Sequence, residues 1–116
     1  MADHDLPEVR AAQNQALFRQ VNERLVRLNE AFEQITEHSI FLCECADITC
    51  VAEIDLSLAE YGRIRHDPRR FFVAPSAEHV VPEAERVVET HDQYFVVEKI
   101  GVAAEIVEAA AEPAIR

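Results

Sequence analysis

The chain has little of what nucleotide-binding and catalytic loops are built from. Its 116 residues include only two glycines, and it contains none of the glycine-rich phosphate-binding motifs. The Gly-x-Ser-x-Gly signature of serine hydrolases and the His-Glu-x-x-His signature of zinc peptidases are also absent. We therefore expect a protein that is not an enzyme.

Long apolar runs and an excess of basic charge are missing as well. No run of about 18 apolar residues could span a bilayer, and residues 1–10 are acidic without the apolar stretch of a secretion signal. The formal net charge of -11, from 22 acidic and 11 basic side chains, repels phosphate backbones and anionic lipid surfaces. These features predict a cytoplasmic protein that binds neither membranes nor nucleic acid.

The composition is that of an ordinary globular domain, with 49% hydrophobic residues. The length fits one folded unit, which we expect to include residues 1–116 with weakly ordered tails at 1–10 and 101–116. Within it, apolar residues recur at spacings of 4, 4, 3, 4 and 3, which predicts one face of a long helix over about residues 7–37. We expect this face to cover the core, and any homodimer to form through this helix. The apolar face contains Leu17, Val21, Leu25, Leu28, Phe32 and Ile35, and the opposite face contains Glu23, Arg27, Glu30, Gln34 and Glu37.

After Ser39 the apolar pattern changes to a period of two, which is typical of strands. A Ser-x-x-Glu capping box predicts a helix at 57–67, and a proline suited to a first turn predicts another at 82–90. The fold class is therefore α+β: a long N-terminal helix, a small and mainly antiparallel sheet with a cysteine-bearing hairpin, and one or two short helices. The predicted strands are 40–43, 51–56, 70–74 and 93–99.

The three cysteines of the chain lie within the stretch "FLCECADITC", residues 41–50. An odd number of cysteines in a reducing cytosol argues against a disulfide framework and favours a metal site or a reactive thiol. Cys43 and Cys45 would lie on the same side of an extended segment, and the four residues before Cys50 allow the chain to turn back. Because zinc prefers four ligands, with thiolates and often one imidazole, these cysteines predict a zinc site that lacks only its fourth ligand.

His79, in the loop after the third predicted strand, is the first choice for that ligand, followed by His66, His38 and His91. Three thiolates and one imidazole would close the coordination sphere, which is typical of a structural site. An iron–sulfur cluster is the less favoured cofactor because its usual cysteine spacings are absent. Two alternatives stay open: a thiol-based redox or metal sensor that uses the same cysteines, and a structural or interaction protein in which the cysteines are buried as small hydrophobes.

A basic cluster interrupts the acidic chain between residues 63 and 70, and arginine is suited to a bidentate grip on phosphate or carboxylate. The favoured interpretation is a helix end that pairs with the abundant glutamates. The alternative is contact with a small anion or an acidic partner through Arg65, Arg69 and Arg70. The cluster contains Arg63, Arg65, His66, Arg69 and Arg70.

Four segments in this order, "FLCECADITC", "LAEYGRIRHDPRRFFVAP", "EHVVPEAERVVE" and "YFVVEK", resemble a family of small uncharacterised bacterial proteins, mostly from actinobacteria. That family carries a Cys-Glu-Cys…Cys segment, followed by Glu-Tyr…Arg…Pro-x-Arg-Phe and His…Pro-Glu segments. The resemblance covers about residues 14–99 and implies no reaction. This sequence departs from it at Glu78, where the family has glycine before the histidine, and the departure bears on how His79 is aimed. The resemblance implies Cys43, Cys45, Cys50 and His79 as the metal set, with Tyr61, Arg65 and Arg70 as recurrent polar positions.

Taken together, the sequence predicts a small cytoplasmic zinc-stabilised domain. Its closed metal site would be structural, and the domain would act by binding another protein.

Overall fold

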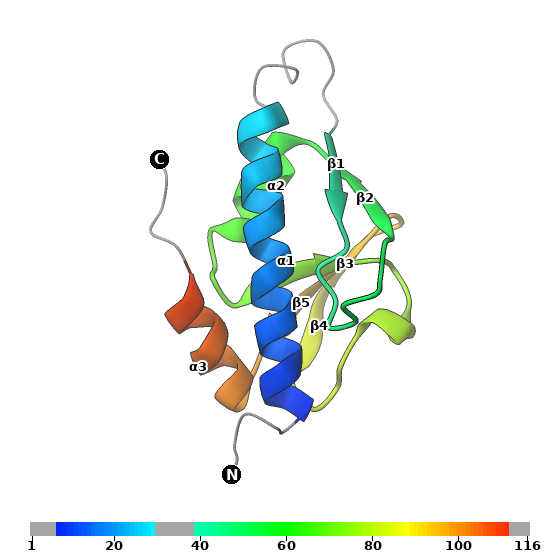
Figure 1. Cartoon of the computed structure of the whole chain (residues 1–116). Coiled ribbons are helices and arrows are strands. Elements are labelled where there is room, and N and C mark those ends of the chain that lie inside the picture. The colour runs from blue at the N-terminus through cyan, green and yellow to red at the C-terminus, as the bar shows by residue number, and fades with distance from the viewer. Residues whose placement is uncertain (1–6, 30–38, 112–116) are drawn as a thin grey trace.

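Figure 1 shows the computed structural model, which describes residues 7–29 and 39–111 of the chain. A long helix precedes short strands and short helices, so the predicted α+β fold is confirmed. The helices are α1 (Pro7–Asn29), α2 (Leu58–Arg65) and α3 (Gly101–Ala110), with a short 3₁₀ helix η2 (Ala77–His79). The strands are β1 (Ser39–Leu42), β2 (Glu53–Leu56), β3 (Arg70–Val73), β4 (Glu85–Thr90) and β5 (Phe95–Lys99).

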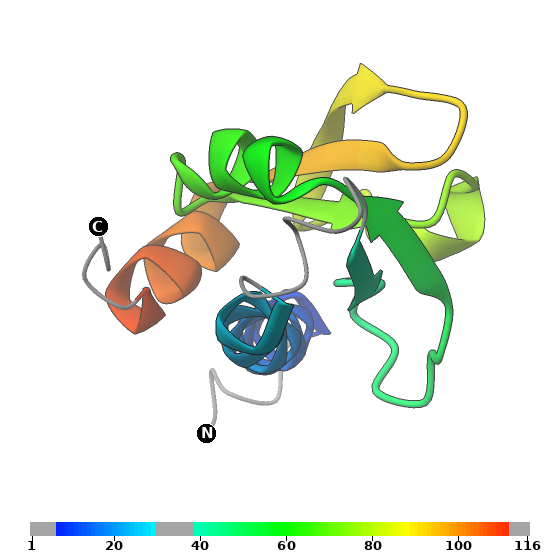
Figure 2. The same ribbon diagram turned by 90° about the horizontal axis from the view of Figure 1, so that it is seen from above.

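The strands of the described residues form one two-stranded and one three-stranded antiparallel sheet. β1 and β2 pair as the predicted hairpin, in which Ser39 lies opposite Leu56 and Leu42 lies opposite Glu53. In the second sheet β5 lies between β3 and β4. α1 runs along one side of the molecule, next to β1 and α3 (Figures 1 and 2).

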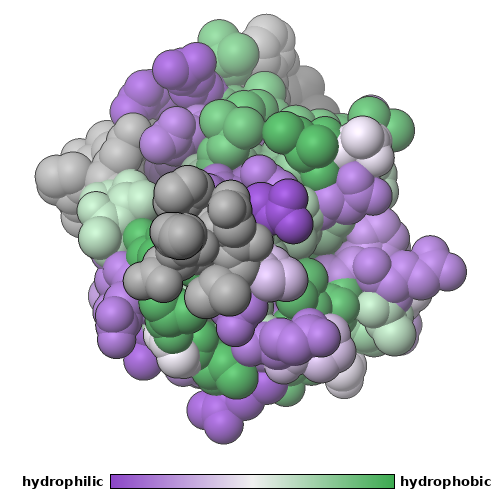
Figure 3. Space-filling view, turned by 60° about the horizontal axis from the view of Figure 1, so that its bottom comes forward, coloured by the Kyte–Doolittle hydropathy of each residue, from purple (hydrophilic) through white to green (hydrophobic). Residues whose placement is uncertain are grey.

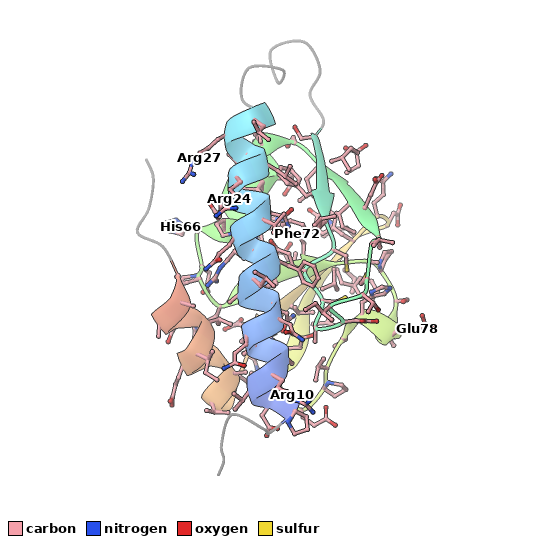
Figure 4. All side chains as sticks on the ribbon, viewed as in Figure 1. Arg10, Arg24, Arg27, His66, Phe72 and Glu78 are labelled. Atoms are coloured by element: carbon pink, nitrogen blue, oxygen red, sulfur yellow. The ribbon has the colours of Figure 1, made fainter. Side chains whose placement is uncertain are left out.

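Three aromatic rings join these elements in one hydrophobic core. Phe41 stacks on Tyr61 with ring centroids 4.8 Å apart, and Phe72, which is labelled in Figure 4, meets both rings edge-on. The rings come from β1, α2 and β3, so their contacts fix the hairpin and α2 against the second sheet. The start of α2 is also as predicted, because the Ser57 hydroxyl accepts a hydrogen bond from the Glu60 amide at 3.0 Å.

The segment 82–90 is a correction to the predicted fold, since it contains β4 and not a helix. Pro82 lies in a turn whose following amides donate hydrogen bonds to the Val81 carbonyl. Val87 and Thr90 then pair with β5, as suits β-branched side chains. Pairing with a central strand thus outweighs the local preference of a proline and glutamates for a first helical turn.

The apolar face predicted for the long helix is also wrong. Leu28 is 67% exposed and Leu17 is 46% exposed, whereas Val21 and Leu25 are half-buried. Even with these exposed leucines, no helix in the described part of the chain is long and apolar enough to cross a membrane. The other predicted members of the two faces lie outside the described residues. They are Phe32 and Ile35 on the apolar face and Glu30, Gln34 and Glu37 on the polar face.

The buried face of α1 combines small and polar side chains instead. Its alanines allow a close approach to the neighbouring elements, and its polar groups find hydrogen-bond partners far away in the sequence. Hydropathy cannot identify such a face, because it scores each polar group without its partner. The buried residues are Val9, Ala11, Ala12, Gln15, Ala16, Phe18, Arg19, Asn22 and Val26.

The segment after Gly101, which we expected to be a weakly ordered tail, contains α3. Gly101 has a φ of 60°, a left-handed conformation that glycine adopts at little cost, so β5 leads directly into the helix. Ala103 and Val107 are fully buried, and Arg19 of α1 donates a hydrogen bond to the Val107 carbonyl at 2.8 Å. These tertiary contacts hold a helix whose own sequence is a weak signal. Of the other predicted tail segments, residues 7–10 begin α1, and residues 1–6 and 112–116 lie outside the described residues.

Candidate metal centre

Three cysteines and one histidine converge at the end of the β1–β2 hairpin. The ligand atoms of Cys43, Cys45, Cys50 and His79 all lie within 4.8 Å of one another. His79 Nδ1 is 3.6 Å from Cys43 Sγ and 3.8 Å from Cys50 Sγ. In a tetrahedral zinc site, with bonds of about 2.3 Å to sulfur and about 2.0 Å to nitrogen, neighbouring ligand atoms are about 3.5–3.8 Å apart. The group therefore has the dimensions of a site for one metal ion.

The hairpin loop brings the three cysteines together. Cys43 directly follows β1, and its amide donates to the Ala52 carbonyl at 2.9 Å, which extends the pairing of the two strands. The Asp47 carboxylate accepts hydrogen bonds from the Thr49 amide at 2.9 Å and from the Thr49 hydroxyl at 2.6 Å. These bonds close a turn of the kind that Asp favours, and the turn directs Cys50 back towards the first two cysteines.

The connection after β3 supplies the histidine. η2 lies next to the hairpin loop in Figure 1, and the His79 amide donates to the Ser76 carbonyl at 3.1 Å. Glu78, where the resemblance predicts glycine, is exposed and points away from the molecule (Figure 4). Its φ is not positive, since Gly101 alone among the described residues has a positive φ. This conformation therefore does not require glycine at position 78.

Hydrogen bonds and burial set the charge on the sulfur atoms. The Ala74 amide donates to Cys43 Sγ at 3.2 Å, an interaction that favours a thiolate. The hydrogen bond between Cys43 and Cys45 lowers the pKa of Cys45 to about 5. The same bond, together with burial, raises the pKa of Cys43. Burial also raises the pKa of Cys50. Because thiolates this close together repel one another, a bound cation is what would allow all three to ionise.

Glu44 points away from its two cysteine neighbours, because successive side chains of an extended segment alternate in direction. It is fully buried and accepts hydrogen bonds from Asn22 Nδ2 at 2.9 Å, from the Phe72 amide at 3.3 Å and from Arg65. The side chain is therefore not placed to move protons at the metal site. It fixes the backbone between two of the ligands.

Arg65 balances the buried charge of Glu44. Its Nη2 lies 2.5 Å from Glu44 Oε2 and its Nε lies 3.3 Å from Glu23 Oε2. Its guanidinium carbon lies 4.9 Å from the centroid of the Tyr61 ring, and the Tyr61 hydroxyl donates to Glu23 at 2.9 Å. Glu23, predicted on a solvated face, thus belongs to this cluster. Since removal of one partner from a buried ion pair costs about 3–5 kcal/mol, the pair locks α2 to the hairpin loop.

Three amide side chains of α1 hold the hairpin loop from the other side. Asn14 Nδ2 donates to a loop carbonyl at 2.9 Å, and Gln15 Nε2 donates to the Glu44 carbonyl at 3.0 Å. Asn22 binds both backbone groups of Leu42 at 2.9 Å, much as a neighbouring strand would. The candidate metal centre and α1 therefore form one hydrogen-bonded unit.

The cluster includes Cys43, Cys45, Cys50 and the preferred histidine of the sequence analysis. The alternative histidines are not part of it. His66 is exposed at the end of α2, and His91 lies 2.9 Å from Glu89. His38 lies outside the described residues.

The arginines near the end of α2 face carboxylates of the same chain. Arg63 makes a bidentate contact with Glu89 at 2.8 and 2.9 Å. Arg69 and Arg70 lie 3.4–3.7 Å from carboxylate groups, and Arg65 is turned into the protein. This agrees with the interpretation of a helix end paired with acidic residues. Contact of Arg65, Arg69 and Arg70 with a small anion or a partner stays a prediction.

The sequence analysis missed the residues that support the ligands. Gln15, Arg19 and Asn22 recur at spacings of 4 and 3, so they share one face of α1. That polar stripe among alanines was an available signal, but the leucine stripe dominated the pattern. Glu44 could have been found from the alternation of side chains in a Cys-Glu-Cys strand, which directs it away from the cysteines. Its pairing with Arg65 carries no local signal.

Comparison of the chain with protein-family models, curated proteins and solved structures finds no match. The resemblance to a small actinobacterial family therefore stays a prediction. The functional argument that follows depends on the geometry of the candidate site and on the surface around it.

Proposed function

We propose that this protein is a small zinc-stabilised domain that acts as a protein-binding module. The observation that carries the zinc proposal is the convergence of Cys43, Cys45, Cys50 and His79 within 4.8 Å. Three sulfur atoms and one imidazole nitrogen are a preferred ligand set for structural zinc. The short spacing supports a single ion over an iron–sulfur cluster, because a cluster places several iron and sulfur atoms between its ligands.

A structural role follows from the number of protein ligands. Four of them complete a tetrahedron and leave no open position for water or a substrate. When bound, zinc would join the hairpin loop to the segment at η2. Because the same loop is hydrogen-bonded to α1 and faces Arg65 of α2 through Glu44, the metal would stabilise the packing of the whole described fold.

The surface around the site supports binding of another protein. Ile48 is 61% exposed and Val51 is 81% exposed, on either side of Cys50 in the hairpin loop. Leu17 and Leu28 add exposed aliphatic groups on α1. Such groups lose water favourably against a protein partner, whereas a net charge of -11 opposes nucleic acid.

A thiol-based sensor is the second candidate, and it is favoured by the partial exposure of Cys50 next to two further sulfur atoms. Hydrogen peroxide would accept two electrons from two of the metal-bound thiolates, which would join as a disulfide. With two protons from the solvent it would be reduced to two water molecules. The metal would then lose two ligands and be released.

The test is elemental analysis of freshly purified protein, with thiol titration before and after peroxide. We expect one zinc ion per chain, and a cobalt-substituted protein with thiolate-to-cobalt charge-transfer bands. Cys45→Ser and His79→Asn should lose metal affinity, whereas the matched control His66→Asn should keep it.

Each alternative has a distinct outcome in this experiment. Protein that contains no metal and has the same thermal midpoint with and without a chelator would show that the cysteines are buried small hydrophobes, and it would end the zinc proposal. Zinc that leaves with peroxide and returns after reduction would make the chain a sensor. Zinc that is retained while the thiols resist oxidation agrees with a structural site.

A further inference from the structure

One face of α1 carries exposed leucines and arginines, although the opposite face belongs to the core of the fold. We define this outer face as Arg10, Leu17, Val21, Arg24 and Leu28. Arg10, Leu17 and Arg24 recur every seven residues, and Val21 and Leu28 lie four residues after the last two, so the side chains share one side of the helix. No other described helix or strand lies in front of this side (Figures 1 and 2). Arg10, Leu17, Arg24 and Leu28 are exposed there, and Val21 is half-buried.

The charge of the outer face is opposite to that of the chain. Arg10 and Arg24 are exposed on it, and the exposed Arg27 lies at its edge. Figure 4 shows Arg24 and Arg27 pointing to the same side of α1. The acidic residues within the helix, Glu8 and Glu23, are half-buried. Glu23 accepts a hydrogen bond from the Tyr61 hydroxyl and pairs with Arg65. Within Pro7–Asn29 the outer face therefore combines aliphatic side chains with arginines and includes no carboxylate, in a protein with a net charge of -11.

Hydrogen bonds from other side chains of α1 make this surface rigid. Asn14, Gln15 and Asn22 bind the hairpin loop, and Arg19 donates to carbonyl groups of Pro68 and Val107 at 2.6 and 2.8 Å. A surface that is fixed before binding loses little conformational entropy on association. Figure 3, which views the molecule from the side of its lower end, shows apolar patches separated by hydrophilic side chains. The outer face of α1 likewise combines exposed leucines with arginines, so its recognition needs a partner that offers both apolar and polar contacts.

We propose that the outer face of α1 is the docking surface for an acidic amphipathic helix of a partner protein. This inference deepens the proposed protein-binding function and rests on it. Leucine-type side chains of the partner would cover Leu17, Val21 and Leu28, and its carboxylates would meet Arg10, Arg24 and Arg27. A second copy of this chain fits less well, because two outer faces would bring arginines against arginines. Duplex DNA also fits less well, because its phosphate backbone offers no row of aliphatic side chains to cover the exposed Leu17 and Leu28.

The probe is a synthetic helical peptide of about three heptads, with leucine at the first and fourth positions and glutamate at the flanking positions. The flanking glutamates repel one another, so the peptide does not pair with itself. A matched peptide carries lysine in place of each glutamate. Binding of both labelled peptides to the zinc-loaded protein is measured by fluorescence anisotropy at physiological salt.

We expect the acidic peptide to bind at least about tenfold more tightly than the lysine peptide. Leu28→Ser, and separately Arg24→Glu with Arg27→Glu, should each weaken the acidic peptide about tenfold or more. Arg86→Glu, a matched reversal of an exposed arginine on β4, should change the affinity less than about twofold.

Several results would overturn the proposal. The first is equal binding of the two peptides, and the second is a loss of affinity with Arg86→Glu as large as with the outer-face variants. A homodimer in sedimentation that Leu28→Ser dissociates would assign the face to a second copy of the chain. Binding of phosphatidylserine vesicles or duplex DNA that Leu28→Ser abolishes would assign it to a lipid surface or to nucleic acid. The zinc content of every variant separates this proposal from the proposed metal site. If zinc-loaded protein does not bind the acidic peptide, the docking proposal is wrong and the zinc proposal stands. If the purified protein contains no metal and still binds the peptide, the zinc proposal is wrong and the docking proposal stands.

Discussion

The two faces of α1 have roles opposite to those that hydropathy assigns. The inner face buries Gln15, Arg19 and Asn22, which hold the hairpin loop and α3, whereas the outer face exposes Leu17 and Leu28. A buried amide costs free energy unless its hydrogen bonds are made, and here the amide nitrogens of Gln15 and Asn22 donate to backbone carbonyls and to the carboxylates of Glu85 and Glu44. The inner face therefore selects one arrangement of the candidate metal loop. The outer leucines add little to that arrangement and are free to serve an interface.

The strongest test of the inner face is Glu44→Ala, which removes the carboxylate that joins α1, α2 and the metal loop. It should lower the free energy of unfolding by about 3–5 kcal/mol, because Arg65 stays turned into the protein with Glu23 but without its shorter contact to Glu44. Urea unfolding of zinc-loaded protein measures this loss. Replacement of both partners by leucine should restore part of it. A loss below about 1 kcal/mol would mean that the ion pair does not hold the loop.

Metal removal tests whether the inner face depends on the metal loop. With free zinc about a hundredfold above its dissociation constant, zinc should add about 2.7 kcal/mol to the free energy of unfolding. A chelator should remove this gain and speed amide exchange in residues 43–50 and in the part of α1 bonded to them. Exchange that changes in the loop but not in α1 would separate the two regions energetically, and unchanged unfolding would contradict the zinc proposal.

Asn22→Ala isolates one contact of the inner face. The variant leaves the Leu42 backbone groups and Glu44 without their Asn22 hydrogen bonds, so we expect a loss of about 1–3 kcal/mol in urea unfolding. The matched control is Gln20→Ala, an exposed amide on the same helix, which should change stability by less than about 0.5 kcal/mol. Similar effects of the two variants would remove the distinction between the faces.

Sequence patterns predicted the parts of this fold that depend on local signals. The period of two found the hairpin, the capping box at Ser57 found α2, and the cysteine spacing placed three ligands together. His79 was a harder prediction, because it depends on where η2 returns the chain. The patterns failed at β4 and at the buried face of α1. In both places contacts with distant residues decide the structure. β4 pairs with β5, and Asn22 of the helix donates a hydrogen bond to Glu44, which is 22 residues away in the sequence.

The exposed ion pair of Arg63 and Glu89 gives a control for the buried one. The Arg63 guanidinium, with His91, lowers the pKa of Glu89 to about 2. A lowered pKa adds stability above the unfolded value, and that stability is lost as the pH falls from about 4.5 towards 2. Glu89→Gln should cost less than about 1 kcal/mol at pH 7. The difference between the two proteins in urea unfolding should shrink below pH 4.5, because Glu89 then becomes protonated and loses its charge. Acid affects the metal ligands of both proteins equally, so this effect cancels in the difference. A difference that grows with acid would contradict the lowered pKa.

The smallest effect is expected on the outer face. Leu28 is 67% exposed, so Leu28→Ala removes few contacts and should lower the free energy of unfolding by less than about 0.5 kcal/mol. Val26, two residues away on the same helix, is 8% exposed, and Val26→Ala should cost about 1–3 kcal/mol through lost burial and the cavity left behind. The pair is matched because both variants place alanine, a good helix former, in the same part of α1. Urea unfolding at low protein concentration measures the folded chain without any partner. A cost of about 2 kcal/mol or more for Leu28→Ala, together with a smaller cost for Val26→Ala, would reverse the assignment of the two faces and return the leucine stripe to the core.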